Sequence, residues 1–336
     1  MTRLSSSATR PRAVALAATL TRPVRWRIDE YSRVGPLVRG HERLRERLER
    51  REERRLLALA RAASEDIRSA QEREPLVTVR VVTYDRGPLI VERALSSILR
   101  QTYERLEILV VGDCCDEVTE RAVRSVRDPR VRFVNLPVRG SYPADRRLRW
   151  MVAGAAPANV ALDLARGAWI APCDDDDELT GDHVEVLLSK ALDDRLELVH
   201  SNALMEATPG SWWVSGGPKL AEGVAHGSIL YSSSLRFMRY SMTSWKRAEP
   251  GDWNLWRRMQ AIGVHSGYLD RITYVHYKGV YKTPELAQLP PTPSPLDDGR
   301  VPDWAEKAPT DRHAALAQPA ELAGSSMSAS KGTVST

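Results

Sequence analysis

The chain has 336 residues, enough for about two domains of ordinary size, and its hydrophobic (42%) and charged (28%) fractions exclude wholesale disorder and fibrous architecture. No apolar run reaches the ~18 residues that cross a bilayer, and a formal net charge of +5 is too small to indicate a nucleic-acid-binding protein. The three cysteines lack the spacing of a disulfide framework or a zinc site, which favours a reducing, cytoplasmic location.

The N-terminal part of the chain is rich in charge. Residues 1–40 carry a clear excess of arginine, and we interpret them as a flexible basic leader. Two roles are open for it: contact with the inner face of an anionic membrane, or no partner at all. Residues 41–74 are predicted to form an amphipathic helix that ends before Pro75. Three roles are open for this helix: packing on the main domain, pairing as a homodimer, or lying on a membrane surface. Its apolar positions recur at three- and four-residue spacings: Leu44, Leu48, Leu56, Leu59, Ala63, Ile67 and Ala70.

Residues 75–280 alternate between strand and helix patterns. Strands are predicted over residues 77–83, 106–111, 131–135, 168–173 and 196–203. Helices are predicted over residues 88–100, 180–192 and 252–262, with a further helix ending over 159–166. This alternation predicts an α/β domain whose mainly parallel sheet is covered by helices on both faces. Loops and short antiparallel strands are expected over 205–250. The Pro-, Ala- and Ser-rich residues 281–336 are predicted to be a largely disordered tail.

Polar side chains follow three of the predicted strands. Thr83 and the three residues after it follow the first strand, Asp113 follows the second, and Asp174–Asp177 follow the fourth. Ligands of open parallel sheets bind at the carboxyl ends of the strands. Four successive carboxylates repel one another unless a cation compensates, and Mg²⁺ or Mn²⁺ accepts oxygen ligands and bridges to phosphate. The alternative is an acidic loop that caps the helix beginning near Thr180.

Several common nucleotide and nucleophile motifs are absent. The sequence has no G-x-x-x-x-G-K-[ST] loop and no G-x-G-x-x-G after the first strand, which argues against P-loop enzymes and standard dinucleotide dehydrogenases. It also has no G-x-S-x-G elbow of the kind found in hydrolases.

Four motifs resemble those of family 2 glycosyltransferases with the GT-A fold. The segment VRVVTYDRGPLIVERALSSILRQTYERLEILVVGD (79–113) resembles the start of that family. Asn159 with ARGAWIAPCDDDDEL (165–179) is similar to its N-x-x-x-x-x-A-x-G-x-x-x-x-x-L-D-x-D-D stretch. GDWNLWRRM (251–259) is similar to its E-D-W-D-L-W-x-R motif, and His276 stands where a late histidine often follows. The resemblance covers about residues 77–279 and implies a nucleotide-diphospho-sugar transferase fold for residues 75–280.

The resemblance also implies roles for particular residues. Tyr84 would lie beside the nucleotide base, and Asp113 would bond to the base. The implied nucleotide-binding residues are Thr83, Tyr84, Asp85, Arg86, Asp113, Asp174 and Asp175. The implied ligands of Mn²⁺ or Mg²⁺ are Asp174, Asp176 and His276. Asp252 would be the general base of an inverting transfer, and the alternative is that it only caps its helix.

The implied function is a metal-dependent inverting transfer of a sugar from a nucleotide-diphosphate donor, a UDP-sugar in the first instance, to an acceptor hydroxyl. The acceptor would be a saccharide or a lipid-linked molecule in surface polysaccharide or glycolipid assembly, and no nucleic-acid partner is expected. The enzyme would be cytoplasmic or peripheral on the inner membrane face. The alternatives are a sugar-nucleotidyltransferase and a non-catalytic sugar-nucleotide-binding scaffold.

Overall fold

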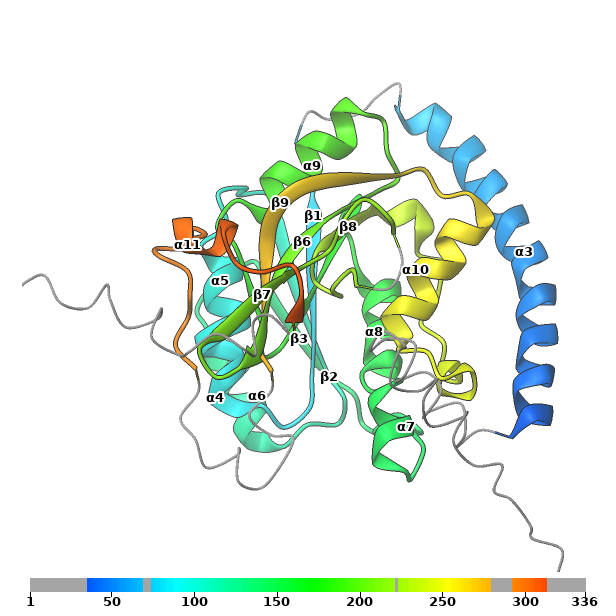
Figure 1. Ribbon diagram of the computed structural model, residues 1–336, viewed down its shortest axis with the longest axis horizontal. Helices are drawn as coiled ribbons and strands as arrows, with labels where there is room; N and C mark the ends of the chain where they lie inside the picture. The colour runs from blue at the N-terminus through cyan, green and yellow to red at the C-terminus, as the bar shows by residue number, and fades with distance from the viewer. Residues whose placement is uncertain (1–34, 69–73, 221–222, 279–291, 313–336) are drawn as a thin grey trace, which may run out of the picture.

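The computed structural model describes residues 35–68, 74–220, 223–278 and 292–312. Within these residues, one mixed sheet has the strand order β3-β2-β1-β4-β8-β6-β9-β5, and β7 pairs with β6 (Figure 1). The predicted α/β class, with a mainly parallel sheet and an N-terminal helix, is confirmed. None of the described helices combines the length and the apolar character needed to cross a membrane.

The first half of the sheet is parallel and the second half is mixed. The parallel strands are β1 (Val77–Thr83), β2 (Leu106–Gly112), β3 (Val131–Asn135) and β4 (Trp169–Asp174). The others are β5 (Glu178–Leu179), β6 (Leu198–Thr208), β7 (Ser211–Ser215), β8 (Ile229–Ser232) and β9 (Ser266–His276). Strands β6 and β9 run parallel, whereas β7 and β8 run antiparallel to β6. The two short antiparallel strands expected within 205–250 are therefore β7 and β8.

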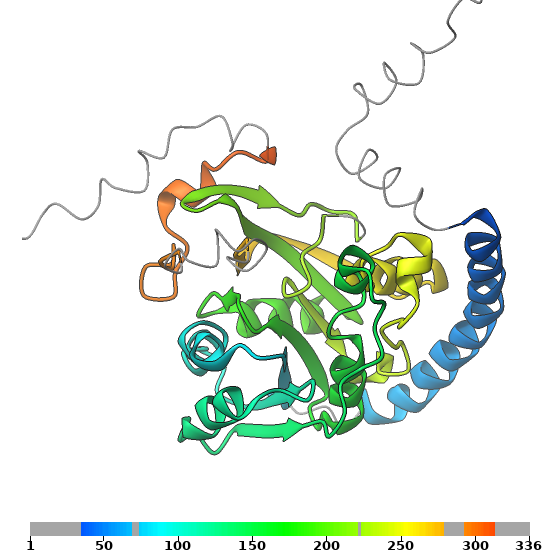
Figure 2. The same ribbon diagram turned by 90° about the horizontal axis from the view of Figure 1, so that it is seen from below.

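Helices cover both faces of the sheet (Figure 2). One face packs against α4 (Gly87–Ile90), the π-helical turn η1 (Val91–Leu95), α5 (Ser96–Leu99), α6 (Glu117–Ser125) and α9 (His183–Asp193). The other face packs against α8 (Ala155–Leu164) and α10 (Gly251–Ile262), near the short helix α7 (Arg146–Trp150). Alternate side chains of β1 face opposite layers, so Val79 and Val81 enter the first layer while Arg80 faces the second.

The N-terminal helix α3 (Pro36–Arg68) begins before residue 41, and residues 1–34 and 69–73 lie outside the described part of the chain. It packs on α10, which is the first of the three roles left open by the sequence, but three of the four leucines at its predicted apolar positions face solvent. Leu44, Leu48 and Leu59 are 58%, 60% and 53% exposed. The buried positions are instead Glu42, Glu46, Glu53 and Leu57.

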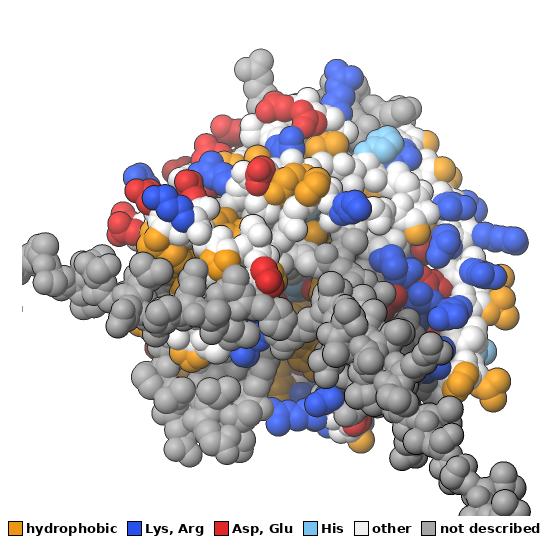
Figure 3. All heavy atoms as spheres, in the orientation of Figure 1, with side chains coloured by type: hydrophobic (Ala, Val, Ile, Leu, Met, Phe, Trp, Pro, Cys, Tyr) orange, Lys and Arg blue, Asp and Glu red, His pale blue; other side chains and the backbone are white. Residues whose placement is uncertain are grey.

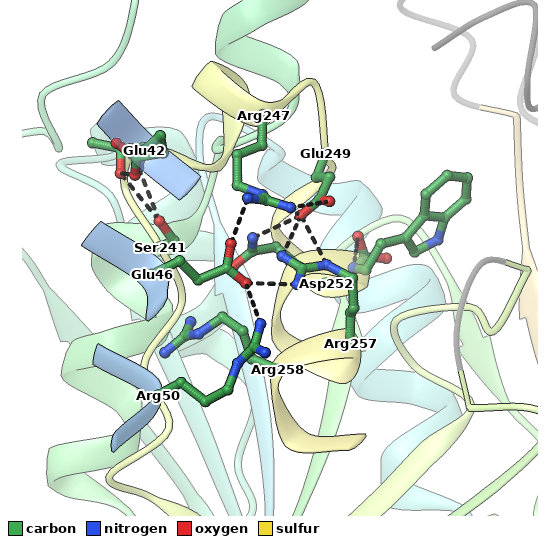
Figure 4. Close-up of polar contacts among 12 residues, drawn as sticks. Glu42, Glu46, Arg50, Ser241, Arg247, Glu249, Asp252, Arg257 and Arg258 are labelled. Carbon is green, nitrogen blue, oxygen red and sulfur yellow. Dashed lines mark hydrogen bonds and ion pairs between the residues drawn. The ribbon is translucent and has the colours of Figure 1, made fainter. Parts of the chain in front are cut away.

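Arginines on the domain explain why the acidic side of α3 is buried (Figure 4). Glu46 forms ion pairs with Arg247 at 2.7 Å and with Arg257 at 2.6 Å. Arg258 donates from Nε to Glu53 at 3.0 Å, and Arg257 also pairs with Glu249 at 2.8 Å. Buried charges require partners, so the arginines of α10 and of the turn before it select the glutamates of α3 over its leucines.

The C-terminal prediction is wrong for residues 292–312, which pack on the domain. Arg93 donates to the carbonyl of Thr292 at 3.0 Å, and Ser294 donates to Glu178 at 2.6 Å. Ala305, in the short helix α11 (Asp303–Glu306), is fully buried. Leu296, Val301 and Ala308 join it against the far edge of the sheet, so the apolar residues between the prolines suffice to dock this segment. Residues 279–291 and 313–336 lie outside the described residues.

Candidate functional site

The carboxyl ends of three parallel strands meet at one edge of the sheet. Thr83 of β1 is in register with Gly112 of β2, and Val82 of β1 is in register with Asp174 of β4. Asp113 follows directly, and its amide donates to the carbonyl of Thr83 at 2.8 Å. The sheet therefore brings the ends of these three strands together, as the strand order requires.

The three residues that follow β1, Tyr84, Asp85 and Arg86, have different surroundings. Asp174, Asp175 and Asp176 form an acidic cluster at the end of β4. Arg86 lies in this cluster, with Nε 3.5 Å from Asp175 and Nη2 3.2 Å from Asp176. Asp85 instead accepts a hydrogen bond at 2.8 Å from the backbone amide of Asp116, at the start of α6. Tyr84 is 39% exposed, and its ring is covered by the guanidinium of Arg139 at 3.5 Å from the ring centroid. An aromatic face with a cation beside it suits a planar base.

Asp113 is buried beneath the loop that holds Arg139. Its carboxylate accepts from the amide of Gly140 at 2.9 Å and from the hydroxyl of Tyr142 at 2.7 Å. Burial and this carboxylate raise the pKa of Tyr142, so the phenol keeps its proton as a donor. Both oxygens of Asp113 already accept a hydrogen bond from this loop. A nucleotide base that bonds to Asp113 would share the carboxylate with Gly140 and Tyr142.

The acidic cluster is electrostatically strained. Burial is the main cause that raises the pKa of Asp175 well above its usual value, and repulsion from Asp176 adds to it. Burial and the charge of Asp177 raise the pKa of Asp176 to about 6. Asp174 behaves in the opposite way: burial opposes ionisation, but the interaction with His226, which donates a hydrogen bond to it, lowers its pKa. The cluster thus holds one firmly ionised carboxylate beside two that a cation would stabilise.

Asp177 orients a histidine rather than entering the cluster. It is fully buried and accepts from the hydroxyl of Tyr274, from the amide of Tyr277 at 2.9 Å and from Nδ1 of His276 at 2.8 Å. Burial disfavours the imidazolium, but the charge of Asp177 prevails and raises the pKa of His276 to about 9. Because Nδ1 faces Asp177, Nε2 is the atom left for a ligand, which is the usual arrangement of a metal-binding histidine.

Asp252 lies in the first turn of α10 and interacts with the acidic cluster. Its Oδ1 accepts from the amide of Trp253 at 2.9 Å, a local cap. Burial raises the pKa of Asp252, the interaction with His226 opposes this rise, and the charge of Asp174 adds to it. Asp252 therefore interacts with both His226 and Asp174, which hydrogen-bond to each other at the end of β4.

Three residues missed by the sequence analysis join these groups. Arg80, in the middle of β1, is fully buried and donates to Nε2 of His226 at 2.9 Å and to the hydroxyl of Tyr240. Since a guanidinium only donates, Nε2 of His226 accepts, and its Nδ1 donates to Asp174 at 2.6 Å. A charged residue in the β-branched run VTVRVVT was the available signal for Arg80. His226 and Tyr240 carried no pattern.

Asn159, from the second motif, has a structural role in this network. Its amide nitrogen donates to the carbonyl of Tyr240 at 2.9 Å, and its oxygen accepts from the amide of Tyr240 at 2.8 Å. This two-way pairing fixes the segment that carries Tyr240 on α8. Asn159 therefore supports the Arg80–His226 pair from outside the site.

The residues fit a divalent cation only together with further ligands. Among the described residues, no three or more His, Cys, Asp or Glu side chains are arranged to hold a metal ion. Asp174 ends β4, Asp176 lies in the turn between β4 and β5, and His276 ends β9. These three side chains nevertheless offer oxygen and imidazole donors. Mg²⁺ and Mn²⁺ are commonly bound by one or two carboxylates, with substrate phosphates and waters completing the shell. A cation here would accordingly be shared with a phosphate ligand.

Part of this chain is similar in sequence to known proteins. The model of glycosyl transferase family 2 matches residues 78–217. WcaA of Escherichia coli K12, named for colanic acid biosynthesis, is 32% identical over 117 residues, which are 34% of this chain and 37% of WcaA. The succinoglycan biosynthesis protein ExoO of Rhizobium meliloti is 34% identical over 122 residues, 36% of this chain and 31% of ExoO. The chain thus matches only about a third of the length of these relatives.

Solved structures are similar at lower identity. TarS residues 1–349 of S. aureus, in complex with UDP-GlcNAc, has 16% identity and a TM-score of 0.48, covering 64% of this chain and 61% of TarS. PcManGT of Pyrobaculum calidifontis, a mannosyltransferase in complex with GDP-Man and Mn²⁺, has 19% identity and a TM-score of 0.47, covering 69% and 70%. Residues 78–217, which include the first two of the four motifs, thus resemble glycosyl transferase family 2.

Proposed function

We propose that the chain is a metal-dependent inverting glycosyltransferase that moves a sugar from a nucleotide-diphosphate donor, first of all a UDP-sugar, to an acceptor hydroxyl. The observation that carries this proposal is the coupling of Asp252 to the acidic cluster. His226 bonds to Asp174 at 2.6 Å, and both groups shift the pKa of Asp252. A carboxylate base beside a phosphate-binding cluster is what a single-displacement transfer requires.

The nucleotide would bind at the ends of β1 and β2. Tyr84 and the adjacent Arg139 offer a flat cationic surface for the base, and Asp113 offers a carboxylate to a ring N–H. Arg86 lies beside Asp175 and Asp176, where it can pair with the diphosphate. A bound Mn²⁺ or Mg²⁺, held by Asp174, Asp176 and His276, would supply Lewis-acid stabilisation of the diphosphate.

Asp252 would act as the general base. As the acceptor oxygen forms its bond to the anomeric carbon, the bond from that carbon to the diphosphate oxygen breaks, and the diphosphate leaves with the electron pair. The hydroxyl proton passes to the carboxylate of Asp252. Burial raises the pKa of this group and makes it a better proton acceptor than an exposed aspartate. The positive end of α10 opposes this effect in part.

The acceptor class rests on relatives. WcaA and ExoO are named for colanic acid and succinoglycan biosynthesis, which favours a saccharide or lipid-linked acceptor in surface polysaccharide or glycolipid assembly. A sugar-nucleotidyltransferase would instead consume a nucleoside triphosphate and release pyrophosphate. A scaffold would bind donor without turnover.

A thermal-shift screen of nucleotide sugars with and without Mn²⁺ tests the proposal. A ligand at about 100 times its Kd stabilises the folded state by about 2.7 kcal/mol, so the matching donor should raise the Tm by several degrees. The rise should require Mn²⁺, because the protein provides only part of the metal shell. Asp176→Asn should abolish the metal-dependent part, whereas Asp193→Asn on the exposed end of α9 should retain it. If no nucleotide-diphosphate sugar shifts the Tm with metal present, the proposal is wrong.

A further inference from the structure

The solvent-facing side of α3 is an unpartnered apolar surface. Leu37, Leu44, Leu48 and Leu59 are 89%, 58%, 60% and 53% exposed. They lie on the side of the helix opposite Glu42, Glu46 and Glu53, which face the domain. Figure 3 shows hydrophobic and basic side chains together along the edge of the molecule where α3 runs. We name the four leucines and the arginines beside them the outer face of α3.

Arginines form a continuous row beside these leucines. Arg43, Arg47, Arg51 and Arg55 are spaced by four residues, so they line one side of the helix, and all four are exposed. Arg55 pairs with Glu52 at 2.8 Å, whereas no ion pair joins Arg43, Arg47 or Arg51 to another residue that the structure describes. Like charges at this spacing destabilise a helix. An anionic partner on this side would compensate the repulsion among these arginines and would be attracted to them.

The acids of α3 do little to neutralise this row, because three of the five whose side chains the structure describes, Glu42, Glu46 and Glu53, are buried against the domain. Glu46 pairs with Arg247 and Arg257, and Glu53 pairs with Arg258. The helix is thus divided into an acidic side that binds the domain and a basic, leucine-bearing side that faces solvent. This segregation follows from the docking itself and is not visible in the net charge of the segment.

We propose that the outer face of α3 docks on an anionic lipid surface. A helix with leucines on one side and flanking arginines lies in the interface of a bilayer, where the arginine stems cover apolar surface and the guanidinium groups reach phosphates. Pairing with a second copy is disfavoured because Arg51 and Arg55 fall between Leu48 and Leu59 on the same face. Two such helices would bury these arginines against each other.

This docking would place the catalytic domain at the membrane. Helix α3 is held on α10 by Glu46 and Arg257, and the first turn of α10 carries Asp252. The inference concerns binding alone and does not depend on the proposed transfer reaction. If that reaction uses a lipid-linked acceptor, the same contact would concentrate the enzyme where the acceptor lies.

Vesicle co-sedimentation of the full chain tests this inference. Phosphatidylcholine vesicles with and without phosphatidylglycerol are compared at near-physiological salt. The wild type should bind only the anionic vesicles. The triple variant R43Q/R47Q/R51Q should lose about tenfold or more in affinity, since each arginine near such a surface contributes about 1 kcal/mol. The matched control R121Q/R124Q/R127Q removes the same charge from α6 and the turn after it, and should stay within about twofold of the wild type.

A leucine variant separates docking from simple charge attraction. L44S/L48S keeps every charge and should also lose about tenfold in affinity, because both side chains would be withdrawn from the interface. All variants keep residues 1–34, so equal vesicle binding by the wild type and both α3 variants would overturn the inference. It is also overturned if the variants instead abolish a dimer or the binding of RNA. Unchanged melting temperatures verify that the variants fold, since the substituted side chains face away from the domain.

Discussion

His183 provides a sharp test of the packing between α9 and β9. The imidazole is fully buried, with Nδ1 2.8 Å from the hydroxyl and 3.1 Å from the carbonyl of Thr273. A carbonyl only accepts, so Nδ1 carries the proton. Nε2 is buried and has no hydrogen-bond partner within the described residues. A second proton on Nε2 would therefore place a charge in an apolar site, and burial lowers the pKa of His183 from 6.5 to about 4.

The direction and size of the effect follow from this difference. Well above pH 6.5, His183 is neutral in both the folded and the unfolded chain, so it does not change the free energy of unfolding. As the pH falls from 6.5 towards 4, the unfolded chain binds a proton that the folded chain refuses, so the free energy of unfolding falls. Between pH 7 and pH 5 the loss from a group with these two pKa values is about 2 kcal/mol.

Urea unfolding of the wild type and of His183→Gln at pH 7 and pH 5 measures this loss. Glutamine can still donate to Thr273 but does not titrate. Other groups that titrate in this range, including Asp176, are common to both proteins and cancel in the comparison. The wild type should lose about 2 kcal/mol more than His183→Gln between the two pH values. Parallel losses in the two proteins would refute the reasoning.

Three further predictions concern the helix and the site. Glu46→Ala should lower the free energy of unfolding in urea by about 3 kcal/mol, because two arginines lose a buried partner. Glu49→Ala, whose carboxylate is 45% exposed, should cost less than about 1 kcal/mol, and equal losses would contradict the docking described here. His226→Gln should weaken Mn²⁺-dependent donor binding by about 10- to 100-fold in thermal-shift titrations, and an unchanged donor affinity would argue against its positioning of Asp174. Asp177→Asn should raise the Mn²⁺ concentration needed for half-maximal activation by about 10- to 100-fold, and an unchanged concentration would exclude His276 as a ligand.

The parallel half of the sheet could be predicted because its strands are short segments rich in apolar and β-branched residues. Strand β9 was missed because exposed polar residues interrupt its first half, so SGYLDRITYVH lacks both the continuous run and a clean alternation. Strand β5 has only two residues and is defined by its pairing with β9. Its position nevertheless matters, because it brings Asp177 beside His276.

The positions of the acids could be predicted from where strands end, but their partners could not. Arg80, His226 and Tyr240 come from distant parts of the chain and meet only in the folded protein. The docking face of α3 could not be predicted, for a related reason. Hydrophobic periodicity assumes that apolar residues face the domain, whereas here the arginines beneath the helix decide which side is buried.

The central claim is that Asp252 takes the acceptor proton beside a donor held by the acidic cluster. Asp252→Asn keeps the shape of the side chain and its bond to the amide of Trp253 but removes the base. The decisive measurement is the single-turnover rate of transfer from a saturating donor, with donor affinity determined in parallel. The account predicts a fall of at least about 100-fold in the rate with donor affinity within a few-fold of the wild type. An unchanged rate would contradict it.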